Sequence, residues 1–474
     1  MDKKNILQLY NTQTKEKETI FAKDKEVIRL YTCGPTVYDY AHIGNFRTYI
    51  FEDLLKRTLQ YFNMKVVHVM NITDVDDKTI KGALVNKVSL DEFTSPYKKA
   101  FFEDIKALRI DPADYYPQAT DYIEDMINII VRLLDKGYAY RGNDGSIYFS
   151  ISKFSDYGKL SHFKLEELKK GASNRCFADE YDKENASDFV LWKSYDEKRD
   201  GSIYWDSIFG LGRPGWHLEC SAMALKLLGD TVDIHCGGVD NIFPHHENEI
   251  AQSESYTGKT FVNHWAHSEY LIVENKKMSK SLGNFYTLRD LLKKGFTPVQ
   301  VRFLLLQTHY RMNLNFTMKG LESAKHSLDR IHDFIVRLNE IDSKVDFENI
   351  DQIINKAKEK FDSSLSDDLN ISAALAALFD FIRDVNVLCD QNKIGKDNAE
   401  SILEFLKKIN KVLQIMSFEE EIDIPDDIKE ALKIREQARG DKNYQEADNQ
   451  RDYINKRGYV IEDTKKGARV KKNG

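Results

Sequence analysis

Between residues 20 and 117, short apolar runs typical of strands alternate with segments in which apolar residues recur about every 3.6 positions, as in helices. Residues 27–31 (VIRLY) and 66–70 (VVHVM) predict two strands. After the first strand and a turn at Gly34 and Pro35, a helix is predicted by the spacing of Phe46, Tyr49, Ile50, Leu54, Leu55 and Leu59. This alternation predicts an α/β domain with a parallel, doubly wound sheet, which binds ligands beyond the carboxyl ends of its strands.

The pattern changes twice further along the chain. Residues 118–209 are less regular and contain turn signals at 142–145 (GNDG) and 157–159 (YGK), so we expect an insertion between two halves of the sheet. Sheet-like segments return at 231–235 (TVDIH). From residue 314 onward, long helical patterns with few glycines predict a helical bundle. Pro425 marks a boundary before a small charged module.

The chain of 474 residues is longer than one hydrophobic core usually supports. We therefore expect several domains, with boundaries where the pattern changes. The two halves of the sheet domain are expected at 1–117 and 210–255, with a connective insertion between them at 118–209. A junction domain is expected at 256–313, the helical bundle at 314–418 and the C-terminal module at 421–474.

Composition excludes several classes of protein. With 42% hydrophobic and 31% charged residues, the chain has the composition of an ordinary globular protein. Its sequence contains no run of 18 apolar residues and no apolar N-terminal segment long enough for a secretory signal, so we expect no membrane partner. The cysteines are few, odd in number and scattered, which favours a reducing cytoplasm over a disulfide framework; they are Cys33, Cys176, Cys220, Cys236 and Cys389.

The formal net charge of −7 is mildly unfavourable for binding nucleic acid, but phosphate contacts need only a local basic face. One candidate face is the acid-free end of the chain, with Lys465, Lys466, Arg469, Lys471 and Lys472. A solvated tail explains this run equally well. Composition therefore leaves nucleic-acid binding open.

Two short motifs indicate phosphate chemistry. Residues 41–45 (AHIGN) lie where a strand and a tight turn lead into the N-terminus of a helix, and a helix N-terminus favours anion binding. At this helix start His42 and Asn45 are expected to project from one helical face. Residues 277–281 (KMSKS) place Lys277 and Lys280 around a hydroxyl residue before a glycine, which is typical of a mobile phosphate-binding loop. These lysines are able to offset charge that develops on a leaving pyrophosphate.

A third motif indicates metal binding. In residues 243–249 (FPHHENE), His245 and Glu249 stand at i and i+4 on one helical face, a spacing suitable for two ligands of one ion. A capped helix with a solvated polar face is an equally good interpretation of this string alone. Cys33 and Cys220 lie in motifs of their own, and a single cysteine is more often a small buried hydrophobe than a ligand. Spacing alone does not join these four residues.

Resemblance does join them. The strings CGPTVYD, HIGN, NITDVDDK, GRPGWHLECSAM, FPHHENE and KMSKS occur here in that order, and together they resemble the cysteinyl-tRNA synthetases, a family of class I aminoacyl-tRNA synthetases. The resemblance extends over most of the chain. It implies a Rossmann-like catalytic domain, an α-helical bundle and a small anticodon-binding module. It also implies one zinc ion that is bound by Cys33, Cys220, His245 and Glu249 and selects the thiolate of substrate cysteine.

The resemblance assigns further roles. ATP, with Mg²⁺, would be bound and activated by His42, Asn45, Gly238, Asp240, Lys277 and Lys280. The amino-acid pocket would contain Thr73 and Trp216, although an ordinary core role is the alternative for Trp216. The anticodon would be read by Arg439, Asp448 and Asp463, which could equally be surface charges. The implied partners are tRNA(Cys), ATP and L-cysteine, and we expect a monomer.

Two other functions remain open at this point. The first is a cysteine ligase of thiol biosynthesis on the same scaffold, which would not need the roughly 150 residues after position 314. The second is a catalytically silent tRNA-binding paralogue, which would not need intact His42, Lys277 and Lys280.

Overall fold

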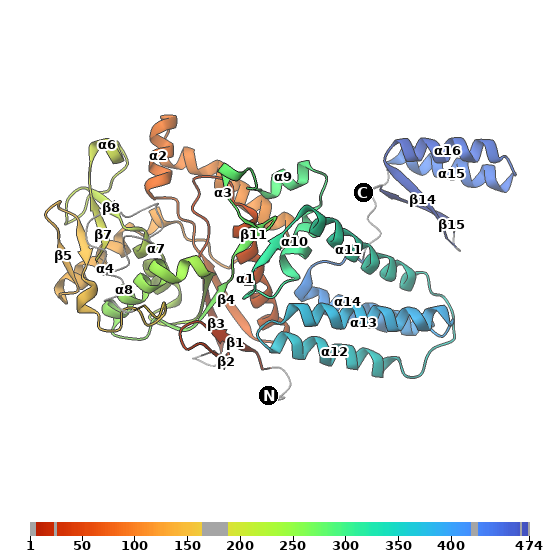
Figure 1. Cartoon of the computed structure of the whole chain (residues 1–474), viewed down its shortest axis with the longest axis horizontal. Coiled ribbons are helices and arrows are strands. Elements are labelled where there is room, and N and C mark those ends of the chain that lie inside the picture. The colour runs from red at the N-terminus through yellow and green to blue at the C-terminus, as the bar shows by residue number, and fades with distance from the viewer. Residues whose placement is uncertain (1–5, 23–25, 164–187, 419–424, 465–466, 473–474) are drawn as a thin grey trace. The chain divides into compact units, whose positions relative to one another are not determined.

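Four parallel strands form the central sheet, in the order β10–β9–β3–β4. The strands are β3 (Val27–Thr32), β4 (Lys65–Met70), β9 (Val232–Gly238) and β10 (Val262–Ser268). From β3 the chain moves first to β4 on one side and later to β9 on the other, so the order reverses between β3 and β9. A parallel sheet binds ligands at such a reversal, beyond the carboxyl ends of the strands. The predicted parallel α/β sheet is confirmed, and its strands β3 and β4 lie side by side (Figure 1). Strand β10 extends the sheet past residue 255.

Helix α1 (Ile43–Tyr61) packs on β4, β9 and β10. Its apolar residues recur at helical spacing, and Phe46, Ile50 and Leu55 are completely buried. Residues 33–42 lead from the carboxyl end of β3 to α1, and α1 leads back to β4, which runs parallel to β3. The first turn of α1 therefore lies at the ligand-binding edge of the sheet.

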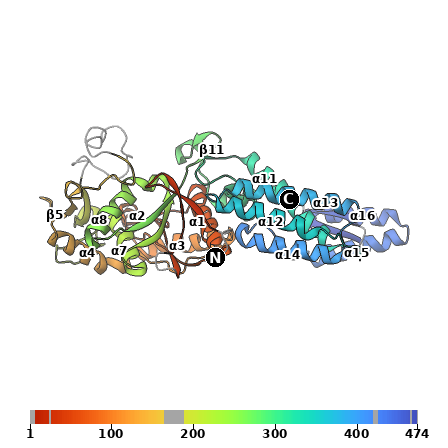
Figure 2. The ribbon, with the colours of Figure 1, turned by 90° about the horizontal axis from the view of Figure 1, so that it is seen from below.

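A second sheet has four antiparallel strands, of which three lie in the segment predicted as an insertion, 118–209, and the fourth lies just after it. Its strands are β5 (Ala139–Arg141), β6 (Ile147–Phe149), β7 (Phe189–Ser194) and β8 (Gly212–Pro214), in sequence order. Three helices, α4 (Ile123–Asp135), α7 (Trp216–Leu228) and α8 (Glu247–Thr257), lie side by side next to β5 in both views (Figures 1 and 2). The shared core, which includes Phe149 and Trp192, joins this sheet to the helices.

Further strands and helices complete this part of the molecule. The strands are β1 (Gln8–Asn11), β2 (Glu16–Thr19), β11 (Leu271–Val273), β12 (Lys276–Lys277) and β13 (Leu314–Phe316). The helices are α2 (Asp77–Asn86), α3 (Leu90–Ala107), α6 (Glu197–Asp200), α9 (Leu288–Lys293) and α10 (Pro298–Leu306). Strands β12, β11 and β13 form a small sheet at the start of the KMSKS segment.

The C-terminal part is mainly helical, as predicted. Four long helices follow one another: α11 (Met318–Asn339), α12 (Ile350–Ser366), α13 (Ile371–Asp390) and α14 (Lys396–Leu413). The last elements are α15 (Asp426–Gly440), α16 (Tyr444–Lys456) and the antiparallel pair β14 (Tyr459–Thr464) and β15 (Gly467–Lys472). They share a small core that contains Ile428, Ile454 and Val470.

This computed structural model describes residues 6–22, 26–163, 188–418, 425–464 and 467–472. Cys176, Lys465 and Lys466 lie outside these ranges. The chain forms two compact units: residues 1–326 with 351–381 and 411–414, and residues 327–350 with 382–410 and 415–474. Among the described residues, no helix combines the length and apolar character needed to cross a membrane.

Candidate metal centre and nucleotide site

Four predicted metal ligands from distant parts of the chain meet beyond the carboxyl ends of β3 and β9. Cys33 follows β3, Cys220 lies in the first turns of α7, and Glu249 lies in the first turn of α8. His245 precedes α8 in a π-helical turn, Ile242–His246. One donor atom from each of the four residues lies within 4.8 Å of the others, and Nε2 of His245 is 3.0 Å from a carboxylate oxygen of Glu249. Cys220, His245 and Glu249 are buried.

The backbone before His245 is not helical throughout. Phe243 is extended, with φ −137° and ψ 131°, and α8 begins only at Glu247. Pro244 explains the break, because a proline disfavours the helical conformation of the residue before it. His245 and Glu249 nevertheless remain on one side of the chain, as their contact shows.

The electrostatics of the cluster favour the anionic, metal-binding forms of Cys220 and Glu249, whereas His245 and Cys33 hold protons that a metal ion would displace. Burial opposes charge on His245, but the carboxylate of Glu249 and the sulfur of Cys220 raise its pKa to about 10. Burial by itself would raise the pKa of Glu249. The neighbouring His235 and His245 outweigh this effect and lower the pKa to about 2, below its usual value. The hydrogen bond from Cys33 lowers the pKa of Cys220 to about 6 and raises that of Cys33. A thiolate and a carboxylate are therefore present at neutral pH.

The donor set fits a zinc ion. Two sulfurs, an imidazole nitrogen and a carboxylate oxygen are all ligands that zinc accepts. Tetrahedral bonds of about 2.0–2.3 Å place such donors roughly 3.5 Å apart, and the donor atoms here lie within 4.8 Å of one another. The chain is thus able to hold a metal with these four residues.

A second possible donor set overlaps the first. Cys33, His235, His246 and Glu249 also have donor atoms within 4.8 Å of one another. His235 Nε2 is 3.0 Å from Glu249 Oε2, and His246 Nε2 is 3.3 Å from Cys33 Sγ. Sequence analysis missed His235 and His246. The available signal for His235 was its place as the last residue of the predicted strand 231–235. In the structure it lies in the middle of β9, opposite Tyr31 of β3.

The two residues predicted for the amino-acid pocket lie at different places around the cluster. Trp216 stacks on the ring of His245, with centroids 4.2 Å apart and planes at 19°. Thr73 is buried just after β4, and its hydroxyl accepts a hydrogen bond from Asn71 Nδ2 at 3.0 Å. Trp216 is therefore a wall of the metal cluster, and Thr73 lies at the carboxyl edge of the same sheet.

The HIGN motif forms the N-terminus of α1. His42 is the N-cap residue: its Nδ1 accepts from the Asn45 N–H at 3.2 Å, and Asn45 Oδ1 accepts from the His42 N–H at 3.0 Å. Burial lowers the pKa of His42 to about 4, so its imidazole is neutral at pH 7. The neutral ring and the helix N-terminus together form a pocket edge that favours anions.

The KMSKS segment lies against this helix start. Ile43 N–H donates to the Tyr286 carbonyl at 3.0 Å, and a Cβ added at Gly44 would lie 3.2 Å from Met278 Cε. Lys280 follows in a short 3₁₀ turn, whereas Lys277 is exposed on β12. The fold thus brings together the two predicted phosphate-binding motifs, more than two hundred residues apart in sequence.

The remaining predicted residues occupy two places. Gly238 ends β9, and Asp240 follows it in a 3₁₀ turn, where burial raises the pKa of its carboxyl. Arg439 and Asp448 are exposed on α15 and α16, and Asp448 pairs with Arg451 at 2.9 Å. Asp463 belongs to β14, but its side chain lies outside the described part.

Comparison with known proteins gives matches to three family models. Residues 19–326 match the model of the tRNA synthetases class I (C) catalytic domain. Residues 360–417 match the DALR domain, and residues 422–470 match the cysteinyl-tRNA ligase anticodon binding domain.

Curated relatives match over nearly the whole chain. The cysteine--tRNA ligase of Protochlamydia amoebophila is 59% identical over 99% of this chain and 98% of its own length. That of Chlamydia felis is 58% identical over 98% of both chains. Among solved structures, a Mycobacterium tuberculosis methionyl-tRNA synthetase shares the fold, with a TM-score of 0.61 at 14% identity over 82% of this chain and 92% of its own.

These matches do not favour a ligase of thiol biosynthesis or a silent paralogue. They extend over the catalytic region, the helical region and the C-terminal module alike. The chain therefore belongs to the cysteine--tRNA ligase family of class I tRNA synthetases.

Proposed function

We propose that this chain activates L-cysteine with ATP to form cysteinyl adenylate and then transfers the cysteinyl group to the terminal adenosine of tRNA(Cys). One observation carries the proposal. The donor atoms of Cys33, Cys220, His245 and Glu249 lie within 4.8 Å of one another at the carboxyl edge of a class I sheet. A cluster rich in sulfur at this position suits an amino acid that is itself a thiol.

The proposed resident metal is one zinc ion, held by these four residues. When bound, zinc lowers the pKa of a substrate thiol and favours sulfur over the hydroxyl of serine. The ring of Trp216 packs on His245 and limits the orientation of this ligand. A site that requires one specific polar contact can reject an analogue by a factor of about 10⁴ without editing.

The chain's own residues would position and activate ATP, which is expected to bind with Mg²⁺. His42 and Asn45 shape the N-terminus of α1 for the phosphates, while Gly238 and Asp240 approach the adenosine. Lys277 and Lys280 would offset charge on the departing pyrophosphate, which is stabilisation realised mainly in the transition state. The substrate carboxylate attacks the α-phosphorus. It needs no general base, because it is already ionised at neutral pH.

Binding of tRNA would use the C-terminal parts, with residues 314–418 as the docking bundle and 421–474 as the anticodon-binding module. Arg439, Asp448 and Asp463 are the proposed contacts to the anticodon, because polar side chains read base edges. We also propose that the catalytic region divides near residues 117 and 209, and that its second half continues past residue 255 through β10. The protein is proposed to act as a monomer in the cytoplasm. The four described cysteines are free thiols, which supports a reducing compartment.

The test combines metal analysis with cysteine-dependent ATP–pyrophosphate exchange on the full-length protein. We expect one zinc ion per chain, exchange that requires cysteine, and negligible exchange with serine. Acylation of tRNA(Cys), but not of other tRNAs, should follow. Exchange supported by a different amino acid, or by none, would contradict the proposal.

A further inference from the structure

A cavity of about 60 Å³ lies beside Trp216, between the start of α2 and the segment that leads from β8 into α7. Its polar lining consists of Asp76, Asp77, Lys193, Arg213, His217 and Glu219. Because Trp216 also stacks on His245, the cavity adjoins the metal cluster. Three carboxyl groups therefore surround a small space beside the proposed binding position of the substrate sulfur.

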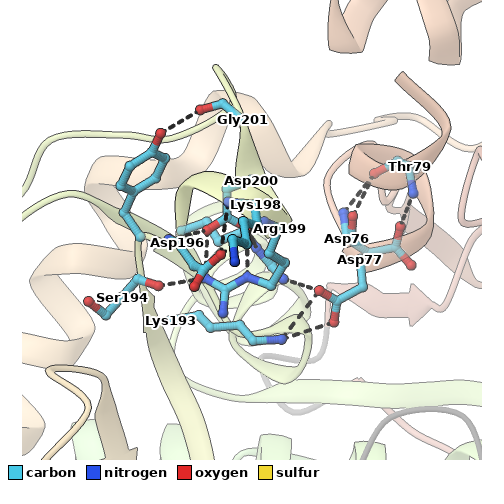
Figure 3. Close-up of polar contacts among 12 residues, drawn as sticks. Asp76, Asp77, Thr79, Lys193, Ser194, Asp196, Lys198, Arg199, Asp200 and Gly201 are labelled. Atoms are coloured by element: carbon cyan, nitrogen blue, oxygen red, sulfur yellow. Dashed lines mark hydrogen bonds and ion pairs between the residues drawn. The ribbon is translucent and has the colours of Figure 1, made fainter. Parts of the chain in front are cut away.

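Two of the three carboxyl groups already have partners (Figure 3). Asp76 is the N-cap of α2, and its Oδ1 accepts from the Thr79 N–H at 2.7 Å. Asp77 forms an ion pair with Arg213 and a second with Lys193, whose Nζ is 3.1 Å from Oδ2. The capping role and the two cations account for the charge and the hydrogen-bonding capacity of these aspartates.

Glu219 differs from both aspartates. Its side chain is 1% exposed, and Oε2 accepts no hydrogen bond from any described residue. The Thr73 hydroxyl is its hydrogen-bond partner, and the other charged groups that act on it most strongly are acidic: Cys220, Asp76 and Asp74. Burial and these acidic neighbours raise the pKa of Glu219. A buried carboxyl oxygen without a partner is costly, and a cation that enters the cavity would supply the partner and favour the ionised form.

The position of Glu219 indicates which cation would enter the cavity. Glu219 directly precedes Cys220, one of the four proposed metal ligands, in the first turn of α7. In cysteine, three bonds separate the sulfur from the α-amino nitrogen, so the two atoms are about 3–4 Å apart. A substrate whose sulfur lies at the cluster therefore carries its ammonium group close to the neighbouring cavity.

We propose that Glu219, through its unpartnered oxygen, binds the α-ammonium group of the amino-acid substrate. This inference rests on the proposed function and adds a second specificity element to it. The cluster selects the thiol, whereas Glu219 selects the amine. Thiols that lack an amino group would then be rejected even though their sulfur fits the cluster.

The test uses the full-length, zinc-loaded protein and two ligands, cysteine and 3-mercaptopropionate, which is cysteine without its amino group. Calorimetry gives both dissociation constants. A charge-assisted hydrogen bond predicts that the unmodified protein binds cysteine about 10- to 100-fold more tightly. Glu219→Gln should weaken cysteine binding by about that factor and leave 3-mercaptopropionate binding and zinc content unchanged.

Two further variants strengthen the test. Glu52→Gln is the matched control, because Glu52 is equally buried, in α1, but does not line the cavity. It should leave the preference for cysteine unchanged. Glu219→Asp retains the negative charge with a shorter side chain, and it replaces Glu219→Gln if that variant fails to fold. We expect it to reduce the preference for cysteine without affecting 3-mercaptopropionate.

Several outcomes would overturn the inference. Equal weakening of both ligands would show that Glu219 acts only by supporting Thr73 or the fold. An unchanged preference in both Glu219 variants would show that another group binds the amine. If the unmodified protein shows no cysteine-dependent pyrophosphate exchange, the proposed function itself fails, and the inference fails with it.

Discussion

The ammonium group of Lys280 is paired with the carboxylate of Asp39, and it also lies 5.1 Å from the centroid of the Phe285 ring. Asp39 belongs to the segment that leads from β3 to α1, whereas Lys280 belongs to the KMSKS segment. The hydrogen bond to Asp39 raises the pKa of Lys280 above its usual value. To contact a bound triphosphate, this lysine must leave or share its partner.

Asp39→Asn should therefore favour ATP binding. Exposed ion pairs of this kind contribute about 0.2–1 kcal/mol, so release of Lys280 should lower the KM for ATP by about 1.5- to 5-fold. Pyrophosphate exchange at varied ATP concentrations measures this value. Asp39→Glu, which keeps the charge, is the control, and a raised KM in Asp39→Asn would argue that Asp39 itself helps to bind ATP or its metal ion.

Lys280→Ala should slow adenylate formation by about 10²-fold or more, because a preorganised charge opposite the leaving pyrophosphate is lost. Single-turnover adenylate formation measures this rate. Affinity for tRNA should stay within about twofold, and Lys276→Ala, which removes an exposed lysine of β12, should change neither quantity. A defect confined to tRNA binding would contradict the assigned role.

Cys220→Ser should lose bound zinc and raise the KM for cysteine. Loss of a sulfur ligand should cost more than the 10- to 100-fold in metal affinity that is typical for changes around the ligands. Elemental analysis after dialysis, together with exchange assays, checks both effects. Cys389→Ser alters another buried thiol, in α13, and should retain the metal. Unchanged zinc content in Cys220→Ser would remove Cys220 from the ligand set.

A pair of histidine variants decides between the two overlapping donor sets. If the ion is held by the proposed set, which includes His245, then His245→Asn should lose zinc. His235→Asn should retain zinc with altered affinity, because His235 is not a ligand in this set but contacts the ligand Glu249 at 3.0 Å. Metal titration against a competing chelator measures both affinities. The reverse ranking would assign the ion to Cys33, His235, His246 and Glu249.

Acid should destabilise the fold partly through His68 in β4. Burial, aided by the charge of Lys56, lowers the pKa of His68 to about 3. The unfolded chain, with a histidine pKa near 6.5, then binds more protons than the folded chain between about pH 6.5 and 3. The contribution of the neutral His68 ring to the free energy of unfolding is complete above pH 6.5. It falls by about 1.4 kcal/mol for each pH unit as the pH decreases through this window.

His68→Gln should reduce this dependence while keeping a hydrogen-bonding group beside Thr32, whose Oγ1 lies 2.9 Å from His68 Nε2. Urea unfolding at pH 7 and pH 5 gives the difference in free energy of unfolding for each protein. His326→Gln removes an exposed histidine and should leave the dependence unchanged. Equal pH dependence of His68→Gln and the unmodified protein would show that His68 does not contribute.

The sequence by itself determined the class of fold and the local motifs. The apolar runs at 27–31 and 66–70 and the spacing of apolar residues in α1 are local properties, and both strands and the helix formed as expected. The HIGN and KMSKS motifs were visible as strings for the same reason, since short segments carry their chemistry in consecutive residues. The parallel sheet followed from the order of these elements.

Spacing in the sequence does not show which distant residues share a site; the resemblance implied four of them, and the tertiary structure brings them together. Cys33, Cys220 and Glu249 come together because β3, α7 and α8 end or begin at one edge of the sheet, and no spacing in the sequence encodes that meeting. The second donor set, with His235 and His246, and the unpartnered oxygen of Glu219 became visible in the same way. Proximity and burial depend on packing of the whole chain, whereas periodicity depends only on neighbours.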